Sequence, residues 1–123
     1  MYIRTTSLEI RAKYIKAILS TNIIDKMTLK EIFNGVDHNN DRFPIVLNGV
    51  THFMTYKEVN KYKRKNKIKN RIELRRTEDG KKIMNRNFNE MLKLYYSNSS
   101  MLTEDKICEL MKEADFYRRF IIK

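Results

Sequence analysis

The chain has 123 residues, which suits one compact domain and excludes a large multidomain enzyme. It carries 26 Lys and Arg against 15 Asp and Glu, a net charge of +11, and 41% of its residues are hydrophobic. That is enough apolar material for a core, and one proline and three glycines are too few for a turn-rich sandwich or barrel. The composition predicts a single, mainly helical domain over residues 1–123, and the excess positive charge favours an anionic partner such as nucleic acid.

The sequence gives no sign of export or of a membrane span. The single cysteine, Cys108, cannot form an internal disulfide, and charged residues interrupt the apolar residues near the N-terminus. No stretch approaches the 18 or so consecutive apolar residues that a transmembrane helix needs. We therefore expect a cytoplasmic protein that makes no membrane contact.

Two helices are predicted in the first third of the chain. The first covers residues 8–20, with Ser7 as its N-cap, because apolar residues recur there at helical spacing: Leu8, Ala12, Ile15 and Leu19. The second is short. Thr28 and Glu31 have the spacing of a capping box, and Gly35 suits a left-handed position at the helix end.

A short edge strand and a third helix are predicted next. The apolar run 43–47 contains a proline and is followed by Asn48-Gly49, which is typical of a strand and turn. Thr55 is placed to cap a helix over residues 56–67, whose narrow apolar stripe consists of Tyr56, Val59 and Tyr62. Most of that helix must face water or an anion.

A β-hairpin is predicted over residues 72–84. Ile72-Glu-Leu alternates in polarity, Thr77-Glu-Asp-Gly resembles a turn, and the pairing would set Leu74 opposite Met84. A fourth helix around residues 88–95 and a fifth beginning at the Thr103 cap follow, separated by the polar break 97–100. Residues 116–122 are expected to extend the fifth helix or to pack beside it.

The positive charge is concentrated in one segment. Residues 57–86 contain 13 Lys and Arg and four acids, a net +9, and no acid lies between Glu58 and Glu73. Solvated helix faces usually interleave Glu with Lys, whereas a run of like charges costs stability through self-repulsion. Phosphate groups would relieve that repulsion, so the pattern favours nucleic-acid binding.

The order of the predicted elements is that of a winged helix-turn-helix domain. The helix after Thr55 would be the recognition helix, with Asn60 able to pair with adenine, and the predicted hairpin would be the wing. The candidate double-stranded-DNA-binding residues are Thr55, Tyr56, Lys57, Asn60, Lys61, Lys63, Arg64, Lys65, Lys67, Lys69, Arg71, Arg75, Arg76, Lys81 and Lys82.

A repeated motif adds a family resemblance. Met27-Thr-Leu-Lys-Glu-Ile recurs as Met54-Thr-Tyr-Lys-Glu-Val, with a weaker copy at residues 102–107. With its size and basicity, the chain resembles the TraN-type double-stranded-DNA-binding accessory proteins of Gram-positive conjugative plasmids. The resemblance implies two helix-turn-helix units around a central sheet, with pseudo-repeat halves of about 1–70 and 71–123. It also implies DNA binding near a transfer origin, or a role in regulating conjugative transfer.

The basic sequence is also compatible with other partners. A small phage or plasmid inhibitor that binds a host nucleic-acid-processing or defence complex through its basic face would have a similar sequence, and direct DNA binding separates the two. RNA is a less suitable partner, because Tyr56 and Tyr62 fit the apolar stripe of a helix better than a sheet surface on which bases would stack. No catalytic motif, metal-ligand spacing or cofactor loop is present, so we expect a non-enzymatic protein without a cofactor. We also expect a monomer or a weak dimer. Cys108 is expected to be a small buried residue.

Overall fold

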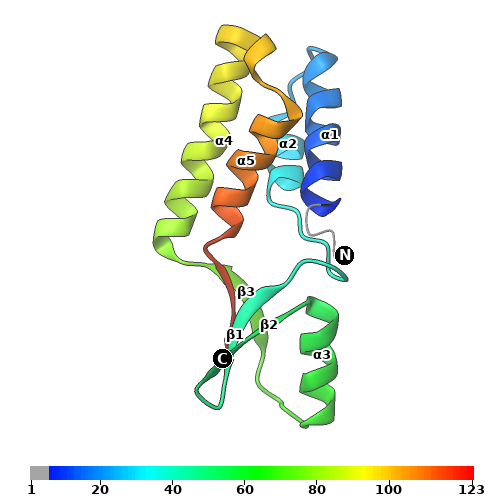
Figure 1. The fold of residues 1–123 in the computed structure, drawn as a ribbon, viewed down its shortest axis with the longest axis vertical. Helices are drawn as coiled ribbons and strands as arrows, with labels where there is room; N and C mark the ends of the chain where they lie inside the picture. The colour runs from blue at the N-terminus through cyan, green and yellow to red at the C-terminus, as the bar shows by residue number, and fades with distance from the viewer. Residues whose placement is uncertain (1–5) are drawn as a thin grey trace.

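A computed structural model describes residues 6–123 and arranges them in two connected parts (Figure 1). The first part is a helical bundle. It contains α1 (Thr6–Ser20), α2 (Lys26–Phe33), α4 (Glu78–Asn98), the short 3-10 helix η1 (Ser99–Met101) and α5 (Glu104–Asp115). The second part holds the strands β1 (Phe43–Leu47), β2 (Val50–Met54), β3 (Ile72–Arg76) and β4 (Arg118–Ile122), and the helix α3 (Tyr56–Lys65). The expectation of a mainly helical protein with a small antiparallel β component is confirmed.

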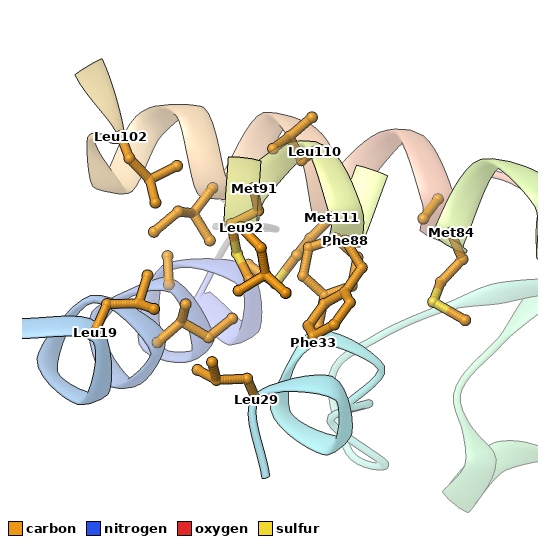
Figure 2. Close-up of a cluster of buried hydrophobic side chains, with 14 residues drawn as sticks. Leu19, Leu29, Phe33, Met84, Phe88, Met91, Leu92, Leu102, Leu110 and Met111 are labelled. Carbon is orange, nitrogen blue, oxygen red and sulfur yellow. The ribbon is translucent and has the colours of Figure 1, made fainter. Parts of the chain in front are cut away.

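The bundle is held by one hydrophobic core (Figure 2). Each helix contributes a stripe of apolar residues at helical spacing, as the sequence predicts. Phe33 of α2 meets Phe88 of α4 edge to face, with ring centroids 5.6 Å apart. The fully buried side chains at the centre come from four helices: Ala12, Ile15, Leu29, Phe33, Met91, Ile107, Met111 and Ala114.

The second part has its own core between the strands and α3. β1 pairs with β2, and β3 pairs with β4, both antiparallel, and β1 lies beside β4 without forming a ladder with it. Phe43 and Phe120 meet edge to face across the two strand pairs, at 6.2 Å between centroids. Val59 of α3 packs against the same cluster, so α3 is anchored to one face of the strands.

A buried ion-pair cluster joins the two parts. Asp115, at the end of α5, accepts a hydrogen bond from Arg11 of α1 at 2.9 Å and from Arg76 of β3 at 3.1 Å, and it lies 3.5 Å from Arg118 of β4. The same arginines donate to backbone carbonyls at helix ends, where the carbonyls have no donor within the helix. Arg11 donates to Phe33, Arg118 to Asn34 and Gly35, and Arg76 to Ala114. This cluster of charges and hydrogen bonds therefore fixes the strands to the bundle.

The predicted hairpin over residues 72–84 is wrong. Thr77 does not begin a turn; its hydroxyl accepts from the Gly80 amide and caps the 21-residue helix α4. Leu74 lies opposite Phe120 of β4, not Met84, which is buried in the bundle core. The wing that this hairpin was expected to form is therefore absent from the described residues.

The end of the chain also differs from the expectation. Residues 118–122 form β4 rather than extending α5, because Leu74 and Phe120 share the second core and complete a strand pair. Figure 1 shows that the helices do not divide into two units around the strands: α1, α2, α4 and α5 lie together in the bundle, and α3 lies apart from them beside the strands. The winged-helix and internal-dimer expectations are thus not confirmed.

Two predicted helix caps need correction. The N-cap of α2 is Asp25, whose carboxylate accepts from the amides of Met27 and Thr28, and the Thr28 hydroxyl donates to the same carboxylate. Because α2 starts earlier than expected, Thr28 lies inside it. Its C-cap is Asn34, and Gly35 has no positive φ. α1 begins at Thr6, so Ser7 is a helical residue and not the cap.

Within residues 6–123, no helix combines the length and apolarity that crossing a bilayer requires.

Candidate nucleic-acid interface

Helix α3 is built so that one side is anchored and the other is free. Its start is a capping box: the Thr55 hydroxyl accepts from the Glu58 amide at 3.1 Å, and the Glu58 carboxylate accepts from the Thr55 amide at 3.0 Å. Val59 is buried, and the Tyr56 ring meets Phe120 edge to face at 5.2 Å between centroids. The predicted cap and apolar stripe are confirmed, which fixes the orientation of the remaining face.

That remaining face carries a stripe of cations, here called the α3 stripe. It consists of four cations and one asparagine, all exposed and at helical spacing: Lys57, Asn60, Lys61, Arg64 and Lys65. Within the described part of the chain, none of its four cations takes part in an ion pair. An unpaired cationic stripe on an anchored helix is suited to binding phosphates.

The one acid of α3 is already engaged. The Glu58 carboxylate accepts from the Thr55 amide and from the Arg42 guanidinium, at 2.5 Å. The backbone hydrogen bond from Thr55, with help from Arg42, lowers the pKa of Glu58 below its usual value. Glu58 therefore serves the helix start and Arg42, and leaves the charge of the α3 stripe uncompensated.

The chain after α3 extends the basic surface. An open hollow of about 520 Å³ lies between the end of the helix and the following loop, lined by Asn60, Lys63, Arg64, Lys67, Ile68 and Lys69. Lys67 has φ of 51°, in the left-handed region that favours glycine. Its amide and that of Ile68 donate back to the carbonyls of Arg64 and Lys63, which closes the helix. A lysine at this strained position adds a cation to the hollow at a cost in stability.

Several predicted site residues lie elsewhere or are structural. Thr55 is 3% exposed and serves as the cap, and Tyr56 packs in the second core. Arg76 belongs to the Asp115 cluster, where burial, with the nearby charge of Arg118, lowers its pKa to about 10. Lys81 and Lys82 are exposed on α4, in the bundle rather than on a wing. The predicted residues that the fold brings together on one surface are those between Lys57 and Lys69.

A second group of cations lies on the β3–β4 pair and is here called the β3–β4 outer face. Arg71 and Arg75, which the sequence analysis assigned to the DNA site, lie beside Arg119 and Lys123 from the end of the chain. Arg119 and Lys123 were not among the predicted DNA-binding residues, because no strand was predicted at residues 118–122. The alternation Arg119-Phe120-Ile121 was the available signal.

The described residues contain no group of His, Cys, Asp and Glu side chains suited to hold a metal ion. Cys108 is half-buried, its thiol lies 3.6 Å from the Leu8 carbonyl oxygen, and burial raises its pKa.

Comparison with known proteins identifies no relative: no family model, curated protein or solved structure matches the chain.

Proposed function

We propose that this protein binds double-stranded DNA, without catalysis, through α3 and the loop that follows it. The observation that carries the proposal is the α3 stripe: four cations, no ion pair to any of them among residues 6–123, on a helix whose opposite side is fixed to the second core. Keeping these charges unpaired costs stability through self-repulsion, and DNA phosphates would remove that cost.

The proposed binding mode uses the exposed side of α3. With its side chains an α-helix is about 10–12 Å across, which fits the B-DNA major groove of about 12 Å, and the 10 residues of α3 give it a length of about 15 Å. Asn60 is exposed in the middle of the stripe and can pair with adenine, while Lys57 and Lys61 reach flanking phosphates. Lys63, Lys67 and Lys69 around the hollow extend the contacts along the backbone.

The proposal also has a biological setting. The size, basicity and repeated Met-Thr-x-Lys-Glu motif favour an accessory or regulatory factor of a mobile element, acting in the cytoplasm. In that setting α3 plays the part that a recognition helix plays in a helix-turn-helix protein, presented here by strands instead of by a neighbouring helix.

The test compares two triple variants with equal charge change. The first removes three stripe cations, Lys57→Gln, Lys61→Gln and Arg64→Gln, and the control removes three exposed lysines of the bundle, Lys13, Lys30 and Lys93. Fluorescence anisotropy with a labelled 20-bp duplex at about 100 mM salt measures affinity, since phosphate contacts dominate binding there.

We expect the α3 variant to lose at least tenfold in affinity and the control to stay within about threefold of the wild type. Equal losses in the two variants would show that only net charge matters. If the wild type binds no duplex at all, the proposal fails, and an inhibitor that binds a host protein becomes the better reading.

A further inference from the structure

The β3–β4 outer face points away from α3. Strand residues alternate between faces, and Leu74 and Phe120 turn inward to the core that holds α3. Arg75 and Arg119, the next residues along each strand, therefore turn outward, and both are exposed. The two basic surfaces lie on opposite sides of the strand pair.

The outer face has more cations than its acid can neutralise. Glu73 is its one carboxylate among the described strand residues, and it already has three cationic partners: Arg71 at 2.9 Å, Arg75 at 2.8 Å and Lys123 at 3.5 Å. Arg119 has no ion pair among residues 6–123. Four cations against one acid leave this face at +3.

The strand register makes this arrangement costly. Arg75 and Arg119 are direct cross-strand partners. Like charges in that position destabilise a strand pair, and the one carboxylate beside them is already shared. An anionic partner that bound both guanidinium groups would remove the repulsion, and Arg side chains bind phosphate oxygens with two parallel hydrogen bonds.

We infer that the β3–β4 outer face is a second DNA-phosphate surface, so that one molecule can hold two duplexes, one on α3 and one on the strands. A single short duplex cannot serve both surfaces, because DNA is stiff over about 150 bp and the surfaces face opposite ways. This inference rests on the proposed function, since it supposes that the anion on α3 is duplex DNA.

A bridging assay tests the inference. A biotinylated 15-bp duplex is immobilised, protein is bound and excess is washed away, and a fluorescent 15-bp duplex is added. The retained fluorescence reports the second duplex, and the retained protein reports binding to the first. The test variant is Arg75→Gln with Arg119→Gln, and the matched control is Lys13→Gln with Lys30→Gln on the bundle.

We expect the wild type and the control to retain the second duplex. The test variant should lose at least four-fifths of it while the first duplex still captures a similar amount of protein. Arg119→Gln alone breaks no ion pair within the described chain, so it should fold normally and lose at least half of the second duplex, and Arg119→Lys should restore most of it.

Two results would overturn the inference. One is a wild type that binds the first duplex and retains no second; the other is a test variant that retains as much as the control. The second result would show that bridging comes from protein association and not from this face. A wild type that is not captured by the first duplex would overturn the proposed function as well, so the two failures are distinguishable.

Discussion

Replacing Asp115 with asparagine should destabilise the protein far more than removing the negative charge of an exposed acid. The Asp115 carboxylate accepts from Arg11 and Arg76 and lies 3.5 Å from Arg118, and the three arginine side chains are only 9%, 9% and 7% exposed. Asparagine keeps the shape but removes the charge, so Arg11 and Arg76 would lose the carboxylate they donate to, in a poorly hydrated site. Arg118 would still have the charge of Asp41 nearby.

The expected loss in the free energy of unfolding follows from that burial. Removing one partner of a buried ion pair costs about 3–5 kcal/mol, a large part of the roughly 5–15 kcal/mol by which domains of this kind are stable. The midpoint of thermal unfolding should fall by more than about 10 °C. The control is Glu78→Gln, whose carboxylate is 84% exposed and pairs with Lys81, and which should change stability by less than about 1 kcal/mol.

Urea denaturation followed by circular dichroism measures both variants. If Asp115→Asn is as stable as Glu78→Gln, within about 1 kcal/mol, the arginine cluster does not join the two parts of the fold as argued.

Three further predictions follow from single sites. Gly80→Ala should destabilise the protein by about 1–3 kcal/mol in a thermal melt, because the added Cβ would overlap the Cβ of Tyr117. This overlap outweighs the better helix propensity of alanine, so a more stable variant would contradict the prediction. Lys67→Gly should gain about 0.5–1 kcal/mol by relieving the left-handed strain and should bind duplex DNA more weakly, whereas unchanged affinity would place Lys67 outside the interface. Cys108 should react with a thiol reagent more slowly than free cysteine at pH 7.5 and faster as the pH rises above 9, since burial raises its pKa; a rate equal to that of free cysteine would refute its burial.

The helices with local signals were predictable from the sequence. The Thr55 cap and the apolar residues at helical spacing placed α3 to within about two residues, and the Thr103 cap fixed the start of α5. These signals are carried by neighbours along the chain, so they do not depend on the rest of the fold. The charge segregation that defines the α3 stripe was equally visible.

The prediction for the segment around Thr77 was wrong because its sequence is compatible with two local structures. Thr77-Glu-Asp-Gly suits a turn, but a Thr cap followed by two acids also suits a helix start, where negative charge meets the positive end of the helix dipole. The structure uses the second option, and Gly80 is required there by the close approach of Tyr117.

The pairing of β3 with β4 could not be read from local sequence. Leu74 and Phe120 are far apart in the chain and come together only because both complete the second core. For the same reason Arg76 was grouped with the DNA-binding cations, although its partner Asp115 lies on another element. The cross-strand pairing of Arg75 with Arg119 depends on that register, so local sequence could not predict it either.

The most direct test of DNA binding through α3 is the salt dependence of duplex affinity. The logarithm of the affinity falls linearly with the logarithm of the salt concentration. Each phosphate that the protein neutralises adds about −0.9 to the slope of that line. The variant lacking Lys57, Lys61 and Arg64 should therefore give a slope shallower than that of the wild type by roughly 2.7, from three lost contacts. The bundle control should keep the wild-type slope. Equal slopes for wild type, α3 variant and control would contradict the account.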